Sequence, residues 1–309
     1  MKKIVITEFM DQAAVDSLSS DFEVLYDPSL ADKTDELHRA IRDADAIIVR
    51  NRTQVRGALL ATAVKLTVVG RLGVGMDNID QEACKSRNIA VFPATGANDG
   101  AVAEYVVSAA LMLFRRAYLS ADRMMAGLWP RTDLMGNEIG GKVLGLIGFG
   151  AIARETCRLA KALGMSVVAY DPFVPVDDPA WNMAAPLELD QLLATADGVS
   201  LHVPLTPETR HLINRDTIAK MKQGAVVINA ARGGVVDENA LIEGLRSGRI
   251  GGAAIDVFET EPLDAAAGKR FEGIGNLILT PHIGGVTVES NVRVSAVTAK
   301  NVRQALEAS

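Results

Sequence analysis

The chain has 309 residues, of which 49% are hydrophobic and 23% charged, with a formal net charge of −6 at pH 7. This length corresponds to about two domains, and the composition is that of an ordinary globular protein. The negative charge argues against binding to nucleic acid or anionic lipid, because such proteins carry basic faces. The two cysteines, Cys84 and Cys157, form no CxxC pair. They exclude a disulfide scaffold and a cysteine metal site, and they favour a reducing compartment.

No segment has the composition of a secretion signal or a membrane span. Only three apolar residues follow the N-terminal lysines, where a secretory signal needs about 7–15. The most apolar stretch, residues 101–114, is interrupted by Glu104 and is shorter than the roughly 20 apolar residues of a membrane helix. We therefore expect a soluble protein of the cytoplasm.

Short apolar runs alternate with segments of helical periodicity along the first third of the chain. This alternation predicts a parallel sheet with crossover helices, one of which covers residues 34–42. The strands predicted here are residues 4–6, 24–26, 47–49, 66–69 and 89–92.

A long helix is predicted over residues 102–118, followed by an interruption at residues 127–130. A second series of strands comes next, and a helix over residues 288–306 closes the chain. We find no internal repeat and no low-complexity linker. The second series of strands comprises residues 142–147, 167–170, 199–203, 225–229, 253–256 and 277–279.

A glycine-rich turn joins the first strand of the second series to the helix that follows it. Gly148, Gly150 and Ala153 form the pattern GxGxxA, in which the glycines let the backbone approach a pyrophosphate at a helix N-terminus. Asp171 ends the next strand, at about the 20-residue spacing expected for a carboxylate that binds the adenosine ribose. Because a carboxylate repels the 2′-phosphate of NADP, the pattern predicts NAD. The alternative for Asp171 is a surface aspartate at the end of a strand.

Three polar side chains, Arg232, Glu261 and His282, each follow a strand of the second series. The carboxyl ends of parallel strands form the ligand-binding edge of an open sheet, so we expect the three to meet there. Hydride transfer to a carbonyl carbon leaves negative charge on oxygen, which a cation stabilises and an acid protonates. Arg232 can bind a carboxylate and the adjacent carbonyl oxygen through its planar guanidinium. His282 can donate the proton, and a neighbouring Glu261 would favour its imidazolium form.

With these residues in place, the chain resembles the D-isomer-specific 2-hydroxyacid dehydrogenases, which include phosphoglycerate, glycerate and hydroxypyruvate-type enzymes. The resemblance covers nearly the whole chain, and the family residues that match Arg232, Glu261 and His282 are catalytic. The motifs that carry it are residues 73–80 (GVGMDNID), 98–104, 148–153, 202–209 (HVPLTPET), 229–241, 256–262 and 281–285.

The resemblance implies NAD as the cofactor. No pair of histidines has metal-ligand spacing, and hydride transfer of this type needs no metal, so no metal is expected. Asp256 is implied to contact the nicotinamide end, and residues 202–204 to lie beside the adenosine. The cofactor-binding residues that these motifs predict are Gly148, Phe149, Gly150, Ala151, Ile152, Asp171, His202, Val203, Pro204, Thr209, Ala230, Ala231, Arg232, Asp256, His282, Gly284 and Gly285.

The resemblance also implies an α/β fold with two Rossmann-like or flavodoxin-like domains, each with a parallel sheet, and an active site in the cleft between them. The substrate-binding domain would comprise residues 1–98 plus 284–309, and the NAD-binding domain residues 99–283. The family pairs through its long helix, which implies a homodimer through residues 102–118 and the arm up to Trp129. The apolar composition of this helix agrees, with packing inside the chain as the alternative.

Two segments of the first third are expected to bind the substrate. The turn at residues 72–74 should hold its carboxylate on backbone N–H groups. The loop at residues 49–53 departs from the Val-Arg-Ser-x-Thr of phosphoglycerate dehydrogenase-like relatives through Asn51 and a second cation, Arg52. Arg52 either faces solvent or binds a second anionic group of a sulfolactate, 3-phosphoglycerate or glycerate type of substrate, with sulfolactate favoured. The predicted substrate-binding residues are Arg50, Asn51, Arg52, Leu72, Gly73, Val74, Asn98, Arg232 and His282.

Two other functions stay open on the sequence. One is a formate or phosphite dehydrogenase on the same fold. Formate enzymes are expected to carry an amide where Glu261 stands, so this carboxylate argues against formate. The other is a corepressor-like protein that senses NAD without catalysis, against which the complete set of Arg232, Glu261 and His282 argues. NADH oxidation with a panel of 2-keto acids separates an enzyme from a sensor.

Overall fold

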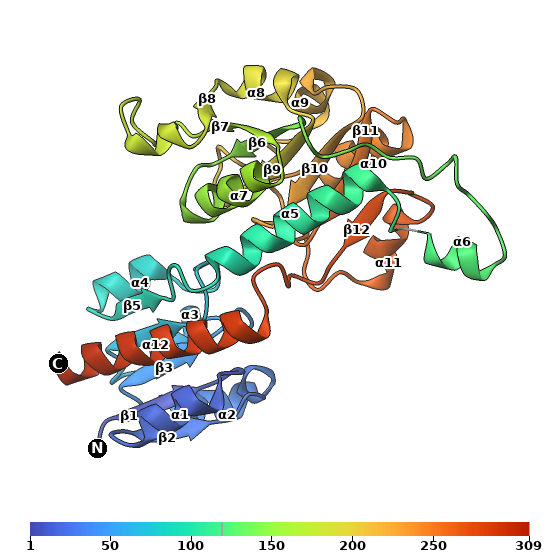
Figure 1. Ribbon diagram of the computed structural model, residues 1–309. Coiled ribbons are helices and arrows are strands. Elements are labelled where there is room, and N and C mark those ends of the chain that lie inside the picture. Colours follow the sequence, from blue (N-terminus) through green and yellow to red (C-terminus); the bar gives the residue numbers. More distant parts are fainter. Residues whose placement is uncertain (119, 309) are drawn as a thin grey trace. The chain divides into compact units, whose positions relative to one another are not determined.

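The computed structural model describes residues 1–118 and 120–308 (Figure 1). The chain divides into two compact units, each with its own parallel sheet. The first unit comprises Met1–Asn98 and the chain from Val286 onward, and the second comprises Asp99–Gly285. No helix in the described part of the chain is long and apolar enough to cross a membrane.

The first unit is a five-stranded parallel sheet between two layers of helices. Its strands are β1 (Lys3–Ile6), β2 (Glu23–Tyr26), β3 (Ala46–Val49), β4 (Val68–Arg71) and β5 (Ala90–Pro93). Its helices are α1 (Gln12–Ser19), α2 (Thr34–Ile41), α3 (Gly57–Thr62), α4 (Gln81–Ser86) and α12 (Val288–Ala308). The strand order is β2-β1-β3-β4-β5. Alternate residues of β1 pack on α1 and α12 or on the opposite helices, so the strands read as continuous apolar runs.

The second unit is a seven-stranded parallel sheet with the order β12-β11-β10-β9-β6-β7-β8. These strands are β6 (Val143–Ile147), β7 (Ser166–Tyr170), β8 (Ala185–Pro186), β9 (Gly198–Leu201), β10 (Ala225–Asn229), β11 (Ile250–Ile255) and β12 (Leu277–Leu279). The order reverses between β6 and β9, and ligands of doubly wound sheets bind at such a switch point.

Helices cover both faces of this second sheet (Figure 1). The covering helices are α5 (Asp99–Arg115), α7 (Ala151–Ala162), α8 (Leu189–Thr195), α9 (Arg215–Lys220) and α10 (Glu238–Arg246). The short helices α6 (Ala121–Met125) and α11 (Ala265–Gly268) bury no residue. Leu144 and Leu146 face α5 and α7, whereas Ile147 and Val199 face α8, α9 and α10. The sheet is therefore buried on both sides. The polar side chains of the predicted site lie in the loops that follow the carboxyl ends of its strands.

The predicted strands are all present, and β10 and β12 have the predicted bounds. The two-residue strand β8 was not predicted, because so short a segment shows no periodicity. The bounds predicted for the long helix, residues 102–118, are wrong at both ends, since α5 covers Asp99–Arg115. Asp99 suits the first turn through its negative charge. Arg116 ends the helix because its φ of 57° lies in the left-handed region.

Candidate active site

Arg232 lies in the loop after β10, and the buried Asn229 shapes this loop. The Asn229 side-chain amide donates to the carbonyl oxygen of Arg232 at 2.9 Å, and its oxygen accepts the N–H of Ala231 at 3.1 Å. A Cβ atom at Gly233 would lie only 1.7 Å from the carbonyl oxygen of Phe258. Glycine therefore lets the Arg232 loop lie directly against the loop that follows β11.

Glu261, in that second loop, is paired with His282. Nδ1 of His282 lies 2.7 Å from Oε2 of Glu261, and Oε1 of Glu261 accepts the N–H of Phe258 at 3.0 Å. Burial would raise the pKa of Glu261, but the bonds from His282 and Phe258 and the charge of Arg232 lower it below its ordinary value. Glu261 is therefore a carboxylate that fixes Nδ1 of His282 as a donor. Nε2 of His282 has no partner among the described residues.

Asp256 holds the backbone around His282. This aspartate is 1% exposed. Its Oδ1 accepts the N–H of Ile283 at 2.8 Å, and its Oδ2 accepts the N–H of Gly284 at 2.8 Å. The carbonyl oxygen of Asp256 accepts the N–H of His282 at 2.8 Å. These bonds support the left-handed φ of 56° at His282, a conformation that costs free energy for a residue with a side chain. A contact of Asp256 with nicotinamide stays a prediction.

Tyr105 of α5 extends the network behind His282. The hydroxyl of Tyr105 lies 2.6 Å from Oγ1 of Thr280, which donates to Oδ1 of Asp256 at 2.6 Å. Because the Thr280 hydroxyl donates its hydrogen to Asp256, the Tyr105 hydroxyl must be the donor in its hydrogen bond with Thr280. Burial raises the pKa of Tyr105 to about 12, so the donor keeps its proton. Neither residue was predicted from the sequence, although each adjoins a motif.

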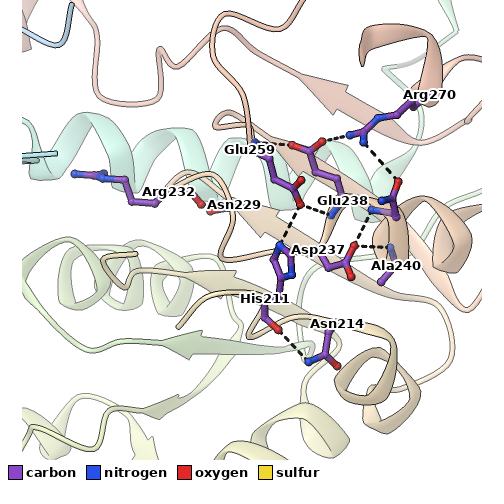
Figure 2. Close-up of polar contacts among 10 residues, drawn as sticks. His211, Asn214, Asn229, Arg232, Asp237, Glu238, Ala240, Glu259 and Arg270 are labelled. Atoms are coloured by element: carbon purple, nitrogen blue, oxygen red, sulfur yellow. Dashed lines mark hydrogen bonds and ion pairs between the residues drawn. The ribbon is translucent and has the colours of Figure 1, made fainter. Parts of the chain in front are cut away.

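The loop that carries Glu261 is also tied to the start of α10 (Figure 2). The N–H of Glu259 donates to Oε1 of Glu238 at 2.7 Å, and the N–H of Glu238 donates to Oε1 of Glu259 at 3.2 Å. Arg270 forms an ion pair with the buried Glu238, and Nε2 of His211 lies 3.3 Å from Glu259. This exchange of hydrogen bonds ties the loop that carries Glu261 to the start of α10.

The predicted dinucleotide turn has the geometry that a pyrophosphate requires. Gly148 has φ of 88°, and a Cβ atom there would lie 2.5 Å from the carbonyl oxygen of His202, so only glycine fits. Gly150 caps α7 without a side chain, and a Cβ atom there would meet no atom within 4 Å. The N–H groups of Ala151 and Ile152 therefore begin a helix whose end is open to an anion. These residues fit the cofactor.

Asp171 follows β7 beside this turn and is anchored by the backbone. Its Oδ2 accepts the N–H of Phe149 at 2.8 Å, and its Oδ1 accepts the N–H of Phe173 at 2.9 Å. Each carboxylate oxygen keeps a further lone pair for a ribose hydroxyl. The Phe149 ring is fully buried and stacks on Trp181 at 5.2 Å between centroids. Phe149 thus serves the site by holding Asp171, and its side chain belongs to the core.

The loop after β9 carries the predicted adenosine contacts. Nε2 of His202 lies 2.9 Å from Oγ of the buried Ser200, and burial lowers the pKa of His202 to about 4, so this imidazole is neutral. Val203 is half-buried and Pro204 is exposed. Oγ1 of Thr209 donates to the carbonyl oxygen of Pro204 at 2.6 Å and so closes the loop.

In the first unit, the predicted anion turn is only partly open. The N–H of Leu72 donates to the end of β3, and the N–H of Gly73 donates to the carbonyl oxygen of Arg71, both at 2.8 Å. Within the described residues, the N–H groups of Val74 and Gly75 have no acceptor. The Arg71 guanidinium donates to the carbonyl oxygens of Leu72 at 2.5 Å and Gly75 at 2.7 Å. Of the three predicted donors only Val74 keeps an open N–H group, and Gly75 adds a second that was not predicted.

The two arginines of the 50–53 loop differ in their surroundings. Arg50 is half-buried, and its Nη2 donates to Oδ1 of Asn291 at 2.8 Å. Arg52 is 53% exposed and forms an ion pair with Asp32. The structure thus favours the solvent-facing alternative for Arg52, and Asn51 beside it is also exposed.

Asn98 is the last residue of the N-terminal segment of the first unit. Its Oδ1 is buried and has no hydrogen-bond partner among the residues that the structure describes. A buried acceptor without a partner costs free energy, so this oxygen suits a donor supplied from outside the protein.

The doubly wound sheet, the open end of α7 and the Arg232, Glu261 and His282 set define a dehydrogenase that binds a nicotinamide dinucleotide. The family model described as D-isomer specific 2-hydroxyacid dehydrogenase, NAD binding domain, matches residues 107–284. The chain is 53% identical over 307 residues to (S)-sulfolactate dehydrogenase of Chromohalobacter salexigens, covering 99% of both chains. It is 39% identical over 308 residues to D-3-phosphoglycerate dehydrogenase of Methanocaldococcus jannaschii, covering 99% of this chain and 58% of that protein.

Solved structures agree with these similarities. D-lactate dehydrogenase from Aquifex aeolicus, complexed with NAD and lactic acid, has a TM-score of 0.84 and 27% identity, with 99% of this chain and 96% of that chain covered. The chain belongs to the D-isomer specific 2-hydroxyacid dehydrogenase family. It is an NAD-dependent oxidoreductase that interconverts a D-2-hydroxy acid and its 2-keto acid. The resemblance, fold class, cofactor and reaction expected from the sequence are confirmed.

Proposed function

We propose that the chain acts on a D-2-hydroxy acid with a second anionic group on carbon 3, and that sulfolactate and sulfopyruvate are its preferred pair. The observation that carries this proposal is the 53% identity to a sulfolactate dehydrogenase over 99% of both chains. 3-Phosphoglycerate is the next candidate of this kind, because a phosphoglycerate dehydrogenase matches over 99% of this chain at 39% identity. Glycerate, whose carbon 3 carries a neutral hydroxyl, is the candidate without a second anionic group.

The (S) descriptor in the name of that relative agrees with a D-specific family. In D-lactate the carboxylate ranks above the methyl group, which gives the descriptor (R). In sulfolactate the sulfur raises the CH2SO3 group above the carboxylate, so the same spatial arrangement is called (S). A site that holds carboxylate, hydroxyl and hydrogen in the D arrangement therefore accepts (S)-sulfolactate without any change of geometry.

The proposed mechanism assigns one task to each catalytic side chain. Arg232 binds the substrate carboxylate and the adjacent carbonyl oxygen, because a guanidinium fork matches two oxygens. Nε2 of His282 donates a proton to that oxygen during reduction and accepts it during oxidation. Glu261, 2.7 Å from Nδ1, stabilises the protonated ring. NAD, when bound at the open end of α7, supplies or accepts the hydride.

Arg50 is the side chain that best suits the second anionic group. It is a half-buried cation, so its contacts with an anion are less screened by solvent than those of the exposed Arg52. The carboxylate on carbon 1 is assigned to the open N–H groups of Val74 and Gly75, beside the cationic Arg71. The oxygen of Asn98 would accept a substrate hydroxyl.

The test is NADH oxidation with sulfopyruvate, phosphohydroxypyruvate, hydroxypyruvate, pyruvate and glyoxylate. The proposal expects the highest kcat/KM for a keto acid with an anionic carbon 3, and for sulfopyruvate among them. A preference for glyoxylate or pyruvate would overturn the second-anion assignment. NADH binding without turnover of any keto acid would instead indicate a sensor.

We also propose a homodimer. The segment between α5 and β6 exposes large apolar side chains, which water disfavours and a partner subunit would cover. Among them Trp129 is 77% exposed and Met125 is 79% exposed. Light scattering at micromolar concentration should give twice the mass of one chain, and a particle of 32.8 kDa would exclude the dimer.

The first unit is proposed to bind substrate and the second NAD, which agrees with the family-model match to residues 107–284. A cytoplasmic location is proposed from the cysteines. Cys84 and Cys157 are both free and buried, as is usual where thiols stay reduced. A fusion to a redox-sensitive reporter in the native cell would test the compartment.

A further inference from the structure

A buried carboxylate lies beneath the 50–53 loop. Glu8 follows β1 and is 3% exposed. Its Oε1 accepts the N–H groups of Arg50 at 2.9 Å and Thr53 at 3.0 Å, and its Oε2 accepts those of Asn51 at 3.2 Å and Arg52 at 3.0 Å. One side chain therefore binds four consecutive backbone amides.

Amides that converge in this way normally form a site for an external anion. Here the protein supplies the anion itself, so the loop backbone cannot bind a substrate carboxylate, sulfonate or phosphate. Burial would raise the pKa of Glu8, but the backbone bonds from Thr53, Arg52 and Arg50 lower it below its ordinary value. Glu8 is therefore charged, and recognition of an anion by this loop falls to its side chains.

Asn78 holds the opposite edge of the same loop. It is 5% exposed, and its Nδ2 donates to the carbonyl oxygens of Thr53 at 2.7 Å and Arg50 at 3.2 Å. Oγ1 of Thr53 also lies 2.7 Å from Oγ1 of Thr7, and both hydroxyls are buried. At both ends of the loop, Arg50 and Thr53, the N–H group therefore donates to Glu8 and the carbonyl oxygen accepts from Asn78.

This arrangement sets where the loop side chains point. With the backbone fixed, the Arg50 guanidinium stays half-buried on Asn291, whereas the Arg52 guanidinium lies at the surface on Asp32. The charge of Glu8 acts on Arg50 through space, and it favours the protonated guanidinium that burial opposes.

We propose that Glu8 and Asn78 are positioning residues for substrate selection: they hold the 50–53 loop from both sides so that Arg50 binds the second anionic group of the substrate. The inference rests on the proposed function. It assigns a task to Asn78 of the GVGMDNID motif and to Glu8, which no sequence motif had marked.

The central experiment is Glu8→Gln, which keeps the size of the side chain but replaces one acceptor oxygen by a donor. KM for sulfopyruvate should rise about tenfold or more, which corresponds to at least one lost charge-assisted contact. KM for glyoxylate should change less than about twofold, and kcat with sulfopyruvate should change little. The Kd of NADH should stay the same. Glu8→Asp keeps the charge and should recover part of the sulfopyruvate KM.

Glu23→Gln is the matched control, because Glu23 is an exposed glutamate of the same unit. Equal losses on sulfopyruvate and glyoxylate in Glu8→Gln would show a merely structural role and overturn the inference, as would no loss on either. If the wild type prefers no anionic keto acid, the proposed substrate class itself fails. A wild type with that preference and an unselective Glu8→Gln refutes only the positioning role.

If Glu8→Gln does not fold, two further measurements test whether Glu8 and Asn78 position the 50–53 loop. Asn78→Ala removes the donors on the other edge and should raise KM for sulfopyruvate selectively in the same way. Amide hydrogen exchange of the wild type should show residues 50–53 protected, because a buried carboxylate holds all four N–H groups. Exchange as fast as that of an open loop, or an Asn78→Ala enzyme with unchanged selectivity, would overturn the inference.

Discussion

Nδ1 of His282 lies 2.7 Å from Oε2 of Glu261, although the two residues belong to loops that follow different strands, β12 and β11. The second oxygen of Glu261 is held by the N–H of Phe258. The carboxylate is thus fixed, and it fixes the imidazole in turn. The ring nitrogen that faces the substrate in the proposed mechanism is therefore Nε2.

Glu261→Gln should move the high-pH limb of the reduction rate to lower pH. Reduction needs protonated His282, and the ionised Glu261 stabilises that form; the lowered pKa of Glu261 keeps it ionised at neutral pH. A neutral amide removes this stabilisation, so the rate of reduction should begin to fall at a lower pH. The measurement is kcat against pH, with the exposed Glu272 changed to Gln as control. An unmoved limb would separate Glu261 from the proton donor.

His282→Ala should lower kcat for keto-acid reduction by about 10²–10⁴, the usual contribution of general acid–base catalysis. NADH binding should be unaffected, which fluorescence titration can check. His38→Ala is a suitable control, because His38 lies in the first unit and is bonded to Thr62. Full activity of the His282 variant would remove this residue from the mechanism.

Asp171→Ala should weaken NADH binding and relax the discrimination against NADPH. In its predicted role the carboxylate accepts hydrogen bonds from the ribose hydroxyls and repels a 2′-phosphate, and its removal abolishes both effects. The ratio of kcat/KM for the two cofactors measures the change, and the exposed Asp177→Ala is the control. A wild-type enzyme that already prefers NADPH would contradict the role given to Asp171.

Tyr105→Phe should lower kcat several-fold and destabilise the protein by about 1 kcal/mol, the value of one hydrogen bond. The variant loses the bond at 2.6 Å to Thr280, which supports Asp256 and through it the His282 backbone. Steady-state kinetics and thermal unfolding check both effects against Tyr118→Phe, since Tyr118 is 69% exposed. Unchanged kcat would confine the bond to a structural role.

Arg50→Ala should cost about ten- to a hundredfold in kcat/KM for sulfopyruvate, since a charge-assisted contact contributes roughly 1.5–3 kcal/mol. Glyoxylate, which has no second charge, should be almost unaffected. Arg52→Ala serves as the matched comparison and should change neither substrate, because Arg52 is paired with Asp32 at the surface. Arg232→Ala should depress all substrates together. A selective loss in Arg52→Ala would reverse the assignment.

The regular fold could be predicted because its signals are local. An apolar run such as Ala225–Asn229 must be buried on both sheet faces whatever its neighbours are. The dinucleotide turn was predictable for the same reason, because Gly148, Gly150 and Ala153 of the GxGxxA pattern lie close together in the chain. Helix ends were less predictable. The end of α5 depends on the left-handed conformation of Arg116, and arginine is not a residue that typically marks such a turn.

The sequence alone therefore determined the parallel strands and the glycine-rich turn, and it predicted Arg232, Glu261 and His282 as catalytic residues, because each of these signals lies in residues close together in the chain. Tertiary structure decided which backbone groups are open to ligands. The N–H groups of Leu72 and Gly73 donate to backbone carbonyl oxygens, and Arg52 forms an ion pair with Asp32. The Glu8 carboxylate accepts the N–H groups of residues 50–53. Most of these contacts join residues that are distant in the chain. They therefore form only when the folded sheet brings the loops at its edge together.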